Sequence, residues 1–192
     1  MPRAKSYDPT VVTTAAMHRF WVHGYNGSAI SDLVHATGIS RHGLYQTFED
    51  KRGLFAAAAA QYVTEVVTPA LNRVERPGAD VQDILAYFRQ QIALAETHGL
   101  PGPGCLMANT MTETGPHDPK VAELVRAHLQ RLTSAFRNAL TPSVDAASLD
   151  EAAWFVTVSA QGLWSVSRTV ETVTPLYSFV DQLMACFERN TG

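Results

Sequence analysis

A short helical segment between a glycine turn and a charged stretch constrains this chain more than any other feature. Residues 38–52 read GISRHGLYQTFEDKR. Leu44 and Phe48 lie four residues apart and share one face of a helix, while polar side chains occupy the other faces. A helix this short is not stable alone in water, so its apolar face must pack on neighbours. Its outward hydrogen-bonding side chains would suit a groove of DNA.

The residues before this segment predict two further short helices. The first helix is expected from Asp8-Pro9 to Gly24, since aspartate caps a helix, proline suits its first turn and glycine ends it. Ser28 is expected to cap the second helix and Ser40 the third. Three short helices with a glycine turn before the last one form a helix-turn-helix.

Helical periodicity continues to the end of the chain, and no sustained strand-like alternation interrupts it. Glycine and proline residues divide this remainder into further helices. Their expected ranges are 51 to 67 or 71, 81 to 98, a short stretch from about 105, 119 to 140, 148 to 173, and 175 to 189. We therefore predict an all-α fold of about nine helices. A three-helix head should occupy residues 1–50, and a larger effector-binding and dimerisation body should occupy residues 51–192.

Composition and charge fit this division. The chain has 192 residues, of which 46% are hydrophobic, enough for a core. It has no uninterrupted apolar run of about 18 residues and no secretory signal at its start, so we expect a cytoplasmic protein without a membrane partner. The net charge is −3, yet residues 1–52 carry six basic and four acidic residues, and the remainder carries nine and fourteen. A basic head on an acidic body has the right sign for DNA binding.

Sequence motifs for metal binding or catalysis are absent. The two cysteines form no CxxC, and the seven histidines have no metal-ligand spacing. The motifs HExxH, GxSxG, GxxxxGK[ST] and GxGxxG do not occur. We therefore expect no metal, no cofactor and no catalytic residue, and predict that the chain is not an enzyme.

The head resembles a known family. The segment FWVHGYNGSAISDLVHATGISRHGLYQTFEDKRGLF contains Phe…Gly-Tyr, Ser-x-Ile, Thr-Gly-Ile-Ser, Leu-Tyr…Phe and Lys…Leu-Phe at the spacing of TetR-type transcriptional regulators. This likeness covers about residues 9–60. The body is similar to one branch of the family through residues 104–107, 117–119 and 161–163. The resemblance implies an all-helical homodimer whose third helices read a palindromic double-stranded operator. A small-molecule effector bound in the body would shift the fourth helix and release the DNA.

The resemblance and the physics of helix ends together predict the DNA contacts. Serine caps leave helix N-termini pointed at anions, and the start of the fourth helix adds a positive charge. The residues expected at phosphates are Ser28, Ser40, Tyr45, Gln46 and Lys51. Those expected at base edges are Arg41, His42 and Gly43. Arginine favours guanine, and glycine lets the backbone approach closely. As alternatives, the serines are only caps, Lys51 is only a surface residue, and Arg41 contacts phosphate.

The body predicts a ligand pocket and a dimer surface. Aromatic and methionine side chains would suit a small hydrophobic effector, with ordinary core packing as the alternative. The predicted pocket residues are Tyr62, Phe88, Ile92, Cys105, Met107, Met111, Phe136, Phe155 and Trp164. The resemblance implies that the last two helices meet their copies in a dimer, with burial inside one subunit as the alternative. The predicted interface residues are Phe155, Ser159, Leu163, Val166, Phe179, Val180, Leu183 and Phe187.

Cys105 could also act as a sensor. It stands at the expected start of a short helix, where a lowered thiol pKa would favour the reactive thiolate. The alternative is a buried, inert cysteine.

The predicted function is that of a ligand-responsive repressor of transcription. An activator, or a regulator that binds DNA without an effector, stays open at this point. The alternative from another class is an all-helical enzyme or carrier for an apolar small molecule with an incidental helix-turn-helix.

Overall fold

The computed structural model describes residues 7–188, and within that range it contains helices and no strands. The helices are α1 (Pro9–His23), α2 (Ile30–Thr37), α3 (Arg41–Phe48), α4 (Lys51–Tyr62), the π-helical turn η1 (Val63–Val67), α5 (Thr68–Glu75), α6 (Val81–His98), α7 (Leu106–Glu113), α8 (Pro119–Leu140), α9 (Leu149–Val166) and α10 (Thr174–Glu188). Because α4, η1 and α5 form one continuous helix, the described residues hold nine helices. The predicted all-α fold is confirmed.

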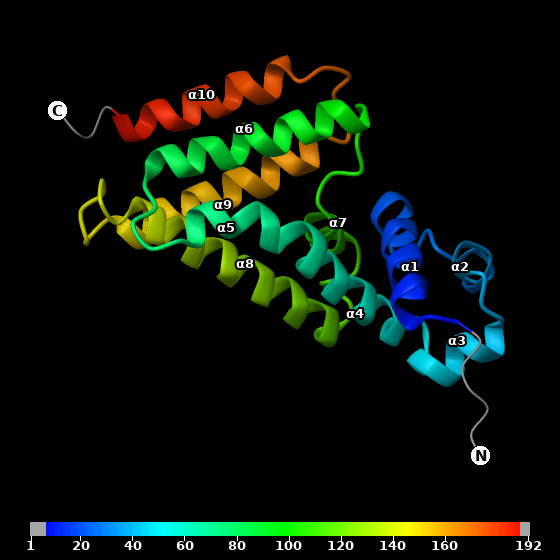
Figure 1. Ribbon diagram of the computed structural model, residues 1–192. Helices are drawn as coiled ribbons and strands as arrows, with labels where there is room; N and C mark the ends of the chain where they lie inside the picture. Colours follow the sequence, from blue (N-terminus) through cyan, green and yellow to red (C-terminus); the bar gives the residue numbers. More distant parts are fainter. Residues whose placement is uncertain (1–6, 189–192) are drawn as a thin grey trace.

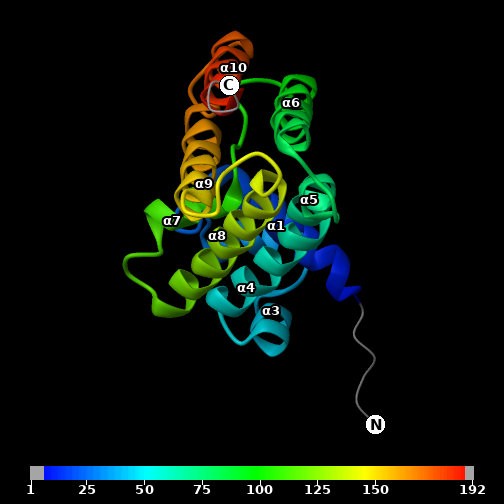
Figure 2. The same ribbon diagram turned by 90° about the vertical axis from the view of Figure 1, so that its left-hand side faces the viewer.

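The helices form a small head and a larger body (Figure 1). In the head, α1 packs on α2 and α4, and α3 packs on α2 and α4. In the body, α8 packs on α9, α5 and α7, while α10 packs on α6. Figure 2, which looks along the body, shows α6 and α10 on the side away from α3. The first half of α4 thus belongs to the packing of the head, and its continuation runs into the body.

Local chemistry fixes where α2 ends and where α3 and α4 begin. Gly38 ends α2 in the left-handed conformation, with φ of 70°, which glycine adopts without steric cost. Ser40 Oγ accepts a hydrogen bond from Gly43 N at 3.1 Å, and Asp50 Oδ1 accepts one from Gly53 N at 2.7 Å. These caps satisfy N–H groups that have no partner inside the helix. The sequence therefore sets where α3 and α4 begin, as predicted.

The predicted cap of α2 is wrong. The N-cap of α2 is Ala29, whose N–H donates to Asp32 Oδ2 at 3.0 Å. Ser28 is fully buried instead, and its hydroxyl donates to Gly24 O at 2.8 Å. A carbonyl near the end of α1 lacks a helical partner, and the serine supplies one from inside the turn.

Two other predicted boundaries also differ. The helix α9 ends at Val166 rather than near Val173, and Ser167 Oγ donates to Trp164 O at 2.8 Å. The fourth helix runs beyond the predicted end at 67 or 71, through Pro69 to Glu75. A proline inside a helix removes one N–H and crowds the preceding turn, and the wider π-helical turn just before it gives that turn room.

Aromatic side chains form much of the core in both parts. In the head, Phe20 meets Phe55 of α4 edge to face at 5.1 Å, and Leu44 of α3 is fully buried. In the body, Phe88 and Phe136 stack at 6.2 Å between ring centres. Since an α4 side chain completes the core of the head, packing continues across the division that the sequence suggests after residue 50.

By length and composition alone, the helix Lys51–Glu75 could cross a membrane. Such a helix is weak evidence, because core helices of globular proteins pass the same test. Here Leu54, Phe55 and Leu71 are buried by other helices, and the helix contacts α1, α3 and α8. This packing is that of a core helix.

A Gly53→Ala substitution should destabilise the junction between α3 and α4. A Cβ at this position would lie 1.9 Å from the carbonyl oxygen of Phe48, which belongs to the backbone and cannot swing away. The free energy of unfolding, measured by urea denaturation, should fall by about 1–3 kcal/mol. Gly43→Ala is the matched control, since its Cβ would meet only Ser40 Oγ at 3.4 Å and Tyr7 Cε1 at 3.7 Å. Equal stability of the two variants would contradict this account.

Candidate DNA interface and effector cavity

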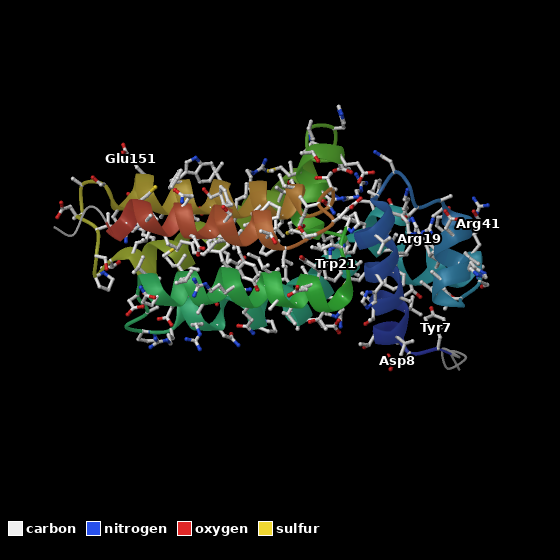
Figure 3. All side chains as sticks on the ribbon, turned by 90° about the horizontal axis from the view of Figure 1, so that it is seen from above. Tyr7, Asp8, Arg19, Trp21, Arg41 and Glu151 are labelled. Atoms are coloured by element: carbon white, nitrogen blue, oxygen red, sulfur yellow. The ribbon has the colours of Figure 1, made fainter. Side chains whose placement is uncertain are left out.

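The helix α3 presents a polar face to solvent. Leu44 is buried against the head, whereas Arg41, His42, Tyr45 and Gln46 are exposed. Figure 3 shows Arg41 at the end of the head that is farthest from the body. The Arg41 guanidinium lies 5.8 Å from the centre of the Tyr45 ring. A protruding helix with such side chains can enter a DNA groove without rearrangement of the core.

Two further predicted phosphate contacts flank this face. Ser40 is exposed at the N-terminus of α3. Lys51 is half-buried at the N-terminus of α4, with Nζ 4.3 Å from the centre of the Tyr25 ring. Burial lowers the pKa of the Lys51 amine, while Glu113 and Asp32 act in the opposite direction. The aromatic ring restricts where the ammonium group can sit, so its charge has a defined position beside α3.

Two residues predicted to contact DNA do not lie on the surface. Ser28 is fully buried. Gly43 is buried too, because the ring of Tyr7 covers it: the Tyr7 hydroxyl donates to Gly43 O at 3.4 Å and contacts the Thr47 hydroxyl. In Figure 3 Tyr7 lies beside α3. The missing side chain of Gly43 makes room for this tyrosine rather than for DNA, so we withdraw both residues from the interface. No sequence pattern singled out Tyr7.

The body contains a cavity of about 500 Å³, bordered by residues of α1, α4, α5, α6, α8 and α9 and by the loop before α7. Its wall is largely aromatic and apolar. Among the predicted pocket residues, the wall includes Tyr62, Cys105 and Trp164. A cavity of this size and lining is typical of small-molecule sites.

The other six predicted pocket residues lie elsewhere: Phe88, Ile92, Met107, Met111, Phe136 and Phe155. Most of them are core residues, as the stacked pair Phe88 and Phe136 illustrates. Phe155 is 49% exposed on the outside of α9. Helical spacing identifies the side chains that turn inward, but it does not separate those that fill the core from those that border a cavity.

The wall also contains polar residues that were not predicted, above all His128 and Gln161. Both are buried, with exposed fractions of 7% and 6%. The sequence contains a signal for His128. This residue stands where the helical spacing of Leu124 and Leu132 would place an apolar side chain. Burial lowers the pKa of His128 to about 4, and the nearby charge of Arg131 adds to this effect. The imidazole is therefore neutral at physiological pH.

Cys105 lies on the same wall, with Sγ 4.0 Å from His128 Nε2. Burial raises the pKa of the thiol, although the backbone of Ala108, the side chain of Tyr62 and the backbone of Met107 act to lower it. The expected lowering at a helix N-terminus is therefore wrong for this cysteine. Removal of the thiol from water outweighs the helix-end effect, and the neutral thiol is the resting form.

Within the described residues, two hydrogen-bonded contacts link α1 and the turn after it directly to the body. Trp21 Nε1 of α1 donates to Gly104 O at 2.8 Å, in the loop that borders the cavity, and Figure 3 shows Trp21 where head and body meet. The carboxylate of Glu113 in α7 accepts hydrogen bonds from Tyr25 N at 2.9 Å and Asn26 N at 2.7 Å. The turn after α1 is thus held by the body through a charged group.

Large apolar side chains are exposed on α9 and α10. On α9 these are Trp154, Phe155, Val158 and Val166, which are 51%, 49%, 50% and 50% exposed, and on α10 Phe179 is 42% exposed. Exposed apolar side chains that recur along one helix form a patch, and such patches mark interaction sites.

The predicted dimer residues divide between this patch and the interior. Phe155, Val166 and Phe179 belong to the patch, and Ser159 is half-buried beside it. Four others are buried within one subunit: Leu163, Val180, Leu183 and Phe187. We therefore remove these four residues from the proposed interface. The apolar stripe of each helix is wide, and one edge of it packs inside the same subunit, as where α10 packs on α6. Trp154 and Val158 belong to the exposed patch but were not among the predicted interface residues.

Both parts of the chain match models of known protein families. A model of bacterial regulatory proteins of the tetR family matches residues 12–58, and a model of tetracyclin repressor-like C-terminal domains matches residues 81–183. The HTH-type transcriptional regulator YezE of Bacillus subtilis is 30% identical over 151 residues, which cover 78% of this chain and 77% of YezE. The repressor ComR of Escherichia coli is 30% identical over 125 residues, or 65% of this chain and 60% of ComR.

Solved structures share the fold. A cysteine mutant of the TetR family regulator CifR, complexed with a 26-base-pair operator, superposes with a TM-score of 0.83 at 22% identity, covering 96% of this chain and 99% of CifR. A TetR regulator from Chloroflexus aurantiacus superposes with a TM-score of 0.78 at 28% identity over 94% of both chains. With both family models and a curated relative in agreement, this chain belongs to the TetR family of bacterial transcriptional regulators.

Proposed function

We propose that this protein is a cytoplasmic, ligand-responsive repressor that binds a palindromic operator as a homodimer. A small molecule in the body cavity would release it from DNA. One observation carries the proposal: α3 is capped, anchored by buried Leu44 and exposed on its polar face. Family membership supports it, since TetR-type proteins are regulators rather than enzymes, and we propose no catalytic activity.

On DNA, α3 would lie in the major groove. Arg41 and His42 would approach base edges, because they protrude from the first turn of the helix. The residues proposed at phosphates are Ser40, Tyr45, Gln46 and Lys51. Both the N-terminus of α3 and the start of α4 add favourable partial charge toward anions.

Dimer formation would use the apolar patch of α9 and α10. Phe155, Val158 and Val166 would pack on the corresponding patch of a second copy, since a two-fold interface brings the same surface of both subunits together. A palindromic operator needs two heads at a fixed separation, and a dimer through the body supplies it.

Release would begin at the cavity wall. Trp21 belongs to the head, yet it borders the cavity and is bonded to Gly104. Tyr62 of α4 meets Trp21 edge to face at 5.0 Å. A ligand that displaces these side chains would therefore bias the position of α1 and α4 together. Such a ligand shifts the equilibrium only as far as it binds one arrangement better than the other.

Selection of bound DNA from a random pool tests the proposal. We expect a palindrome whose half-sites lie about one helical turn apart, roughly 34–36 Å, or farther. Lys51→Ala should weaken binding to all sequences and lower the slope of log affinity against log salt by about 1. Arg41→Ala should instead relax the preference at one or two base pairs, by about 1–3 kcal/mol.

The control for both variants is Arg89→Ala, an exposed basic residue of α6 in the body. It should leave affinity, salt slope and preference unchanged. A pool without an enriched palindrome would reject the repressor and leave the alternative, a carrier of apolar small molecules. Normal operator binding by both head variants would reject the assigned contacts.

Phe155→Asp and Val158→Asp should each produce monomers. A carboxylate in an apolar interface would lose hydration without gaining a partner. Analytical ultracentrifugation should show the change in mass, and operator affinity should fall with it. Val11→Asp is the control, since Val11 is 63% exposed on α1, outside the patch. A Phe155→Asp variant that sediments as a dimer would place the interface elsewhere.

Glu113→Gln should loosen the contact between α7 and the turn after α1. Hydrogen bonds to a charged acceptor contribute about 1.5–3 kcal/mol. Amide hydrogen exchange at Tyr25 and Asn26 should therefore accelerate about tenfold or more in the variant. Glu96→Gln, an exposed residue of α6, serves as the matched control. Unchanged exchange in Glu113→Gln would mean that the carboxylate does not hold the turn.

A further inference from the structure

We propose that Gln161 and His128 form a hydrogen-bonding subsite in the cavity wall. The cavity would accordingly take an uncharged, mainly aromatic molecule that carries one hydroxyl or carbonyl group. The inference rests on the proposed function only in calling that molecule the effector; the subsite itself is argued from the chemistry of the wall.

Gln161 of α9 and His128 of α8 border the cavity from two helices that pack on each other. Both side chains are more than nine-tenths buried. The helices α8 and α9 are the most extensively paired in the body, and Thr133 Oγ1 lies 3.1 Å from Thr157 Oγ1 between them. His128 precedes Thr133 by five residues, and Gln161 follows Thr157 by four. On antiparallel helices these steps lead in the same direction, so the two side chains lie at one level.

The polar atoms of this pair are buried without partners. Within the described residues, neither Oε1 nor Nε2 of Gln161 has a hydrogen-bond partner, and neither has Nδ1 of His128. The other ring nitrogen of His128 faces Cys105 Sγ at 4.0 Å. Native proteins leave few buried polar atoms unpaired, because each loses its hydration without compensation. Three such atoms, on two side chains that border one cavity, therefore point to a ligand group that would pair with them once these side chains turn toward it.

The charges around the subsite favour a neutral partner. The buried imidazole is itself neutral, as its low pKa implies. Arg131, whose charge acts on His128, is already paired, since its Nε and Nη2 donate to the two carboxylate oxygens of Glu75 at 2.7 and 2.9 Å. Glu65 also borders the cavity but is exposed to solvent. An ionised ligand group would be buried beside the subsite without a counter-charge, which is strongly unfavourable.

The hydrogen-bonding capacity of Gln161 and His128 further restricts which polar group the ligand can carry. The amide of Gln161 both donates and accepts, and a neutral imidazole has one donor and one acceptor nitrogen. A hydroxyl or carbonyl group can use such partners. The rest of the ligand would lie against Trp21, Tyr62 and Trp164, whose rings favour aromatic surfaces. Together these features define the ligand class.

Three probes with one ring system test this class: naphthalene, 2-naphthol and 2-naphthoate. Calorimetry with the full chain should show 2-naphthol binding about tenfold more tightly than naphthalene. The anion 2-naphthoate should bind most weakly. Gln161→Leu should reduce the preference for 2-naphthol over naphthalene to about threefold or less, without weakening naphthalene itself. Gln130→Leu, the same change at an exposed residue of α8 outside the cavity wall, should keep the full preference.

Thermal melting checks that each variant folds, and Gln161→Met replaces Gln161→Leu if the leucine variant does not. Equal binding of naphthol and naphthalene, tightest binding of naphthoate, binding of none of the three, or a preference that survives both Gln161 substitutions would each overturn the inference. DNA selection with the same protein separates the two proposals. A recovered palindrome without the probe preference leaves the repressor standing and removes the subsite. If the protein prefers 2-naphthol but no palindrome is recovered, the subsite stands and the repressor is rejected.

Discussion

The packing of α1 on α4 is the interaction on which the rest of the molecule depends. Phe20 of α1 meets Phe55 of α4 in the core of the head, and seven residues farther along the same helix Tyr62 borders the cavity. The helix continues through the π-helical turn to Glu75 without a break. One rigid element therefore belongs to the core of the head at one end and to the cavity wall at the other. A displacement of this helix at the cavity must therefore also displace its end in the head, and the reverse, because packed cores are not freely deformable.

Two further contacts restrict how the head can follow that movement. Trp21 is bonded to Gly104, and Gly104 has φ of 68° with its Cα so close to Trp164 that an added Cβ would lie 2.6 Å from Trp164 O. This position therefore requires glycine. Glu113 holds the turn after α1 by two backbone amides. Apart from the continuous helix, the head is therefore held to the body at two separate places.

The sequence predicts the helices well because their signals are local. Caps such as Ser40 and the left-handed Gly38 act within a few residues, and the structure confirms where α3 begins. Errors arose where distant residues decide the outcome. Gly43 offered a close approach to any neighbour, and Tyr7 takes that place. Cys105 stands at a helix start, yet burial by other helices governs its pKa. The cavity wall is equally non-local, since helix crossing decides which buried residues face an open space.

The arrangement of the cavity separates what selects a ligand from what responds to it. Gln161 and His128 lie on α9 and α8, which pack on each other, and α9 also carries the proposed dimer surface. Trp21 and Tyr62 lie on the elements that carry the head. A ligand that gained affinity only from the first pair would bind both arrangements of the head equally and would shift nothing. In the proposed mechanism, release of DNA would therefore draw on contacts with the second pair. Hydrogen bonding to the residues of α8 and α9 would determine which molecule binds. The size of that molecule where it contacts α1 and α4 would determine whether binding moves the head.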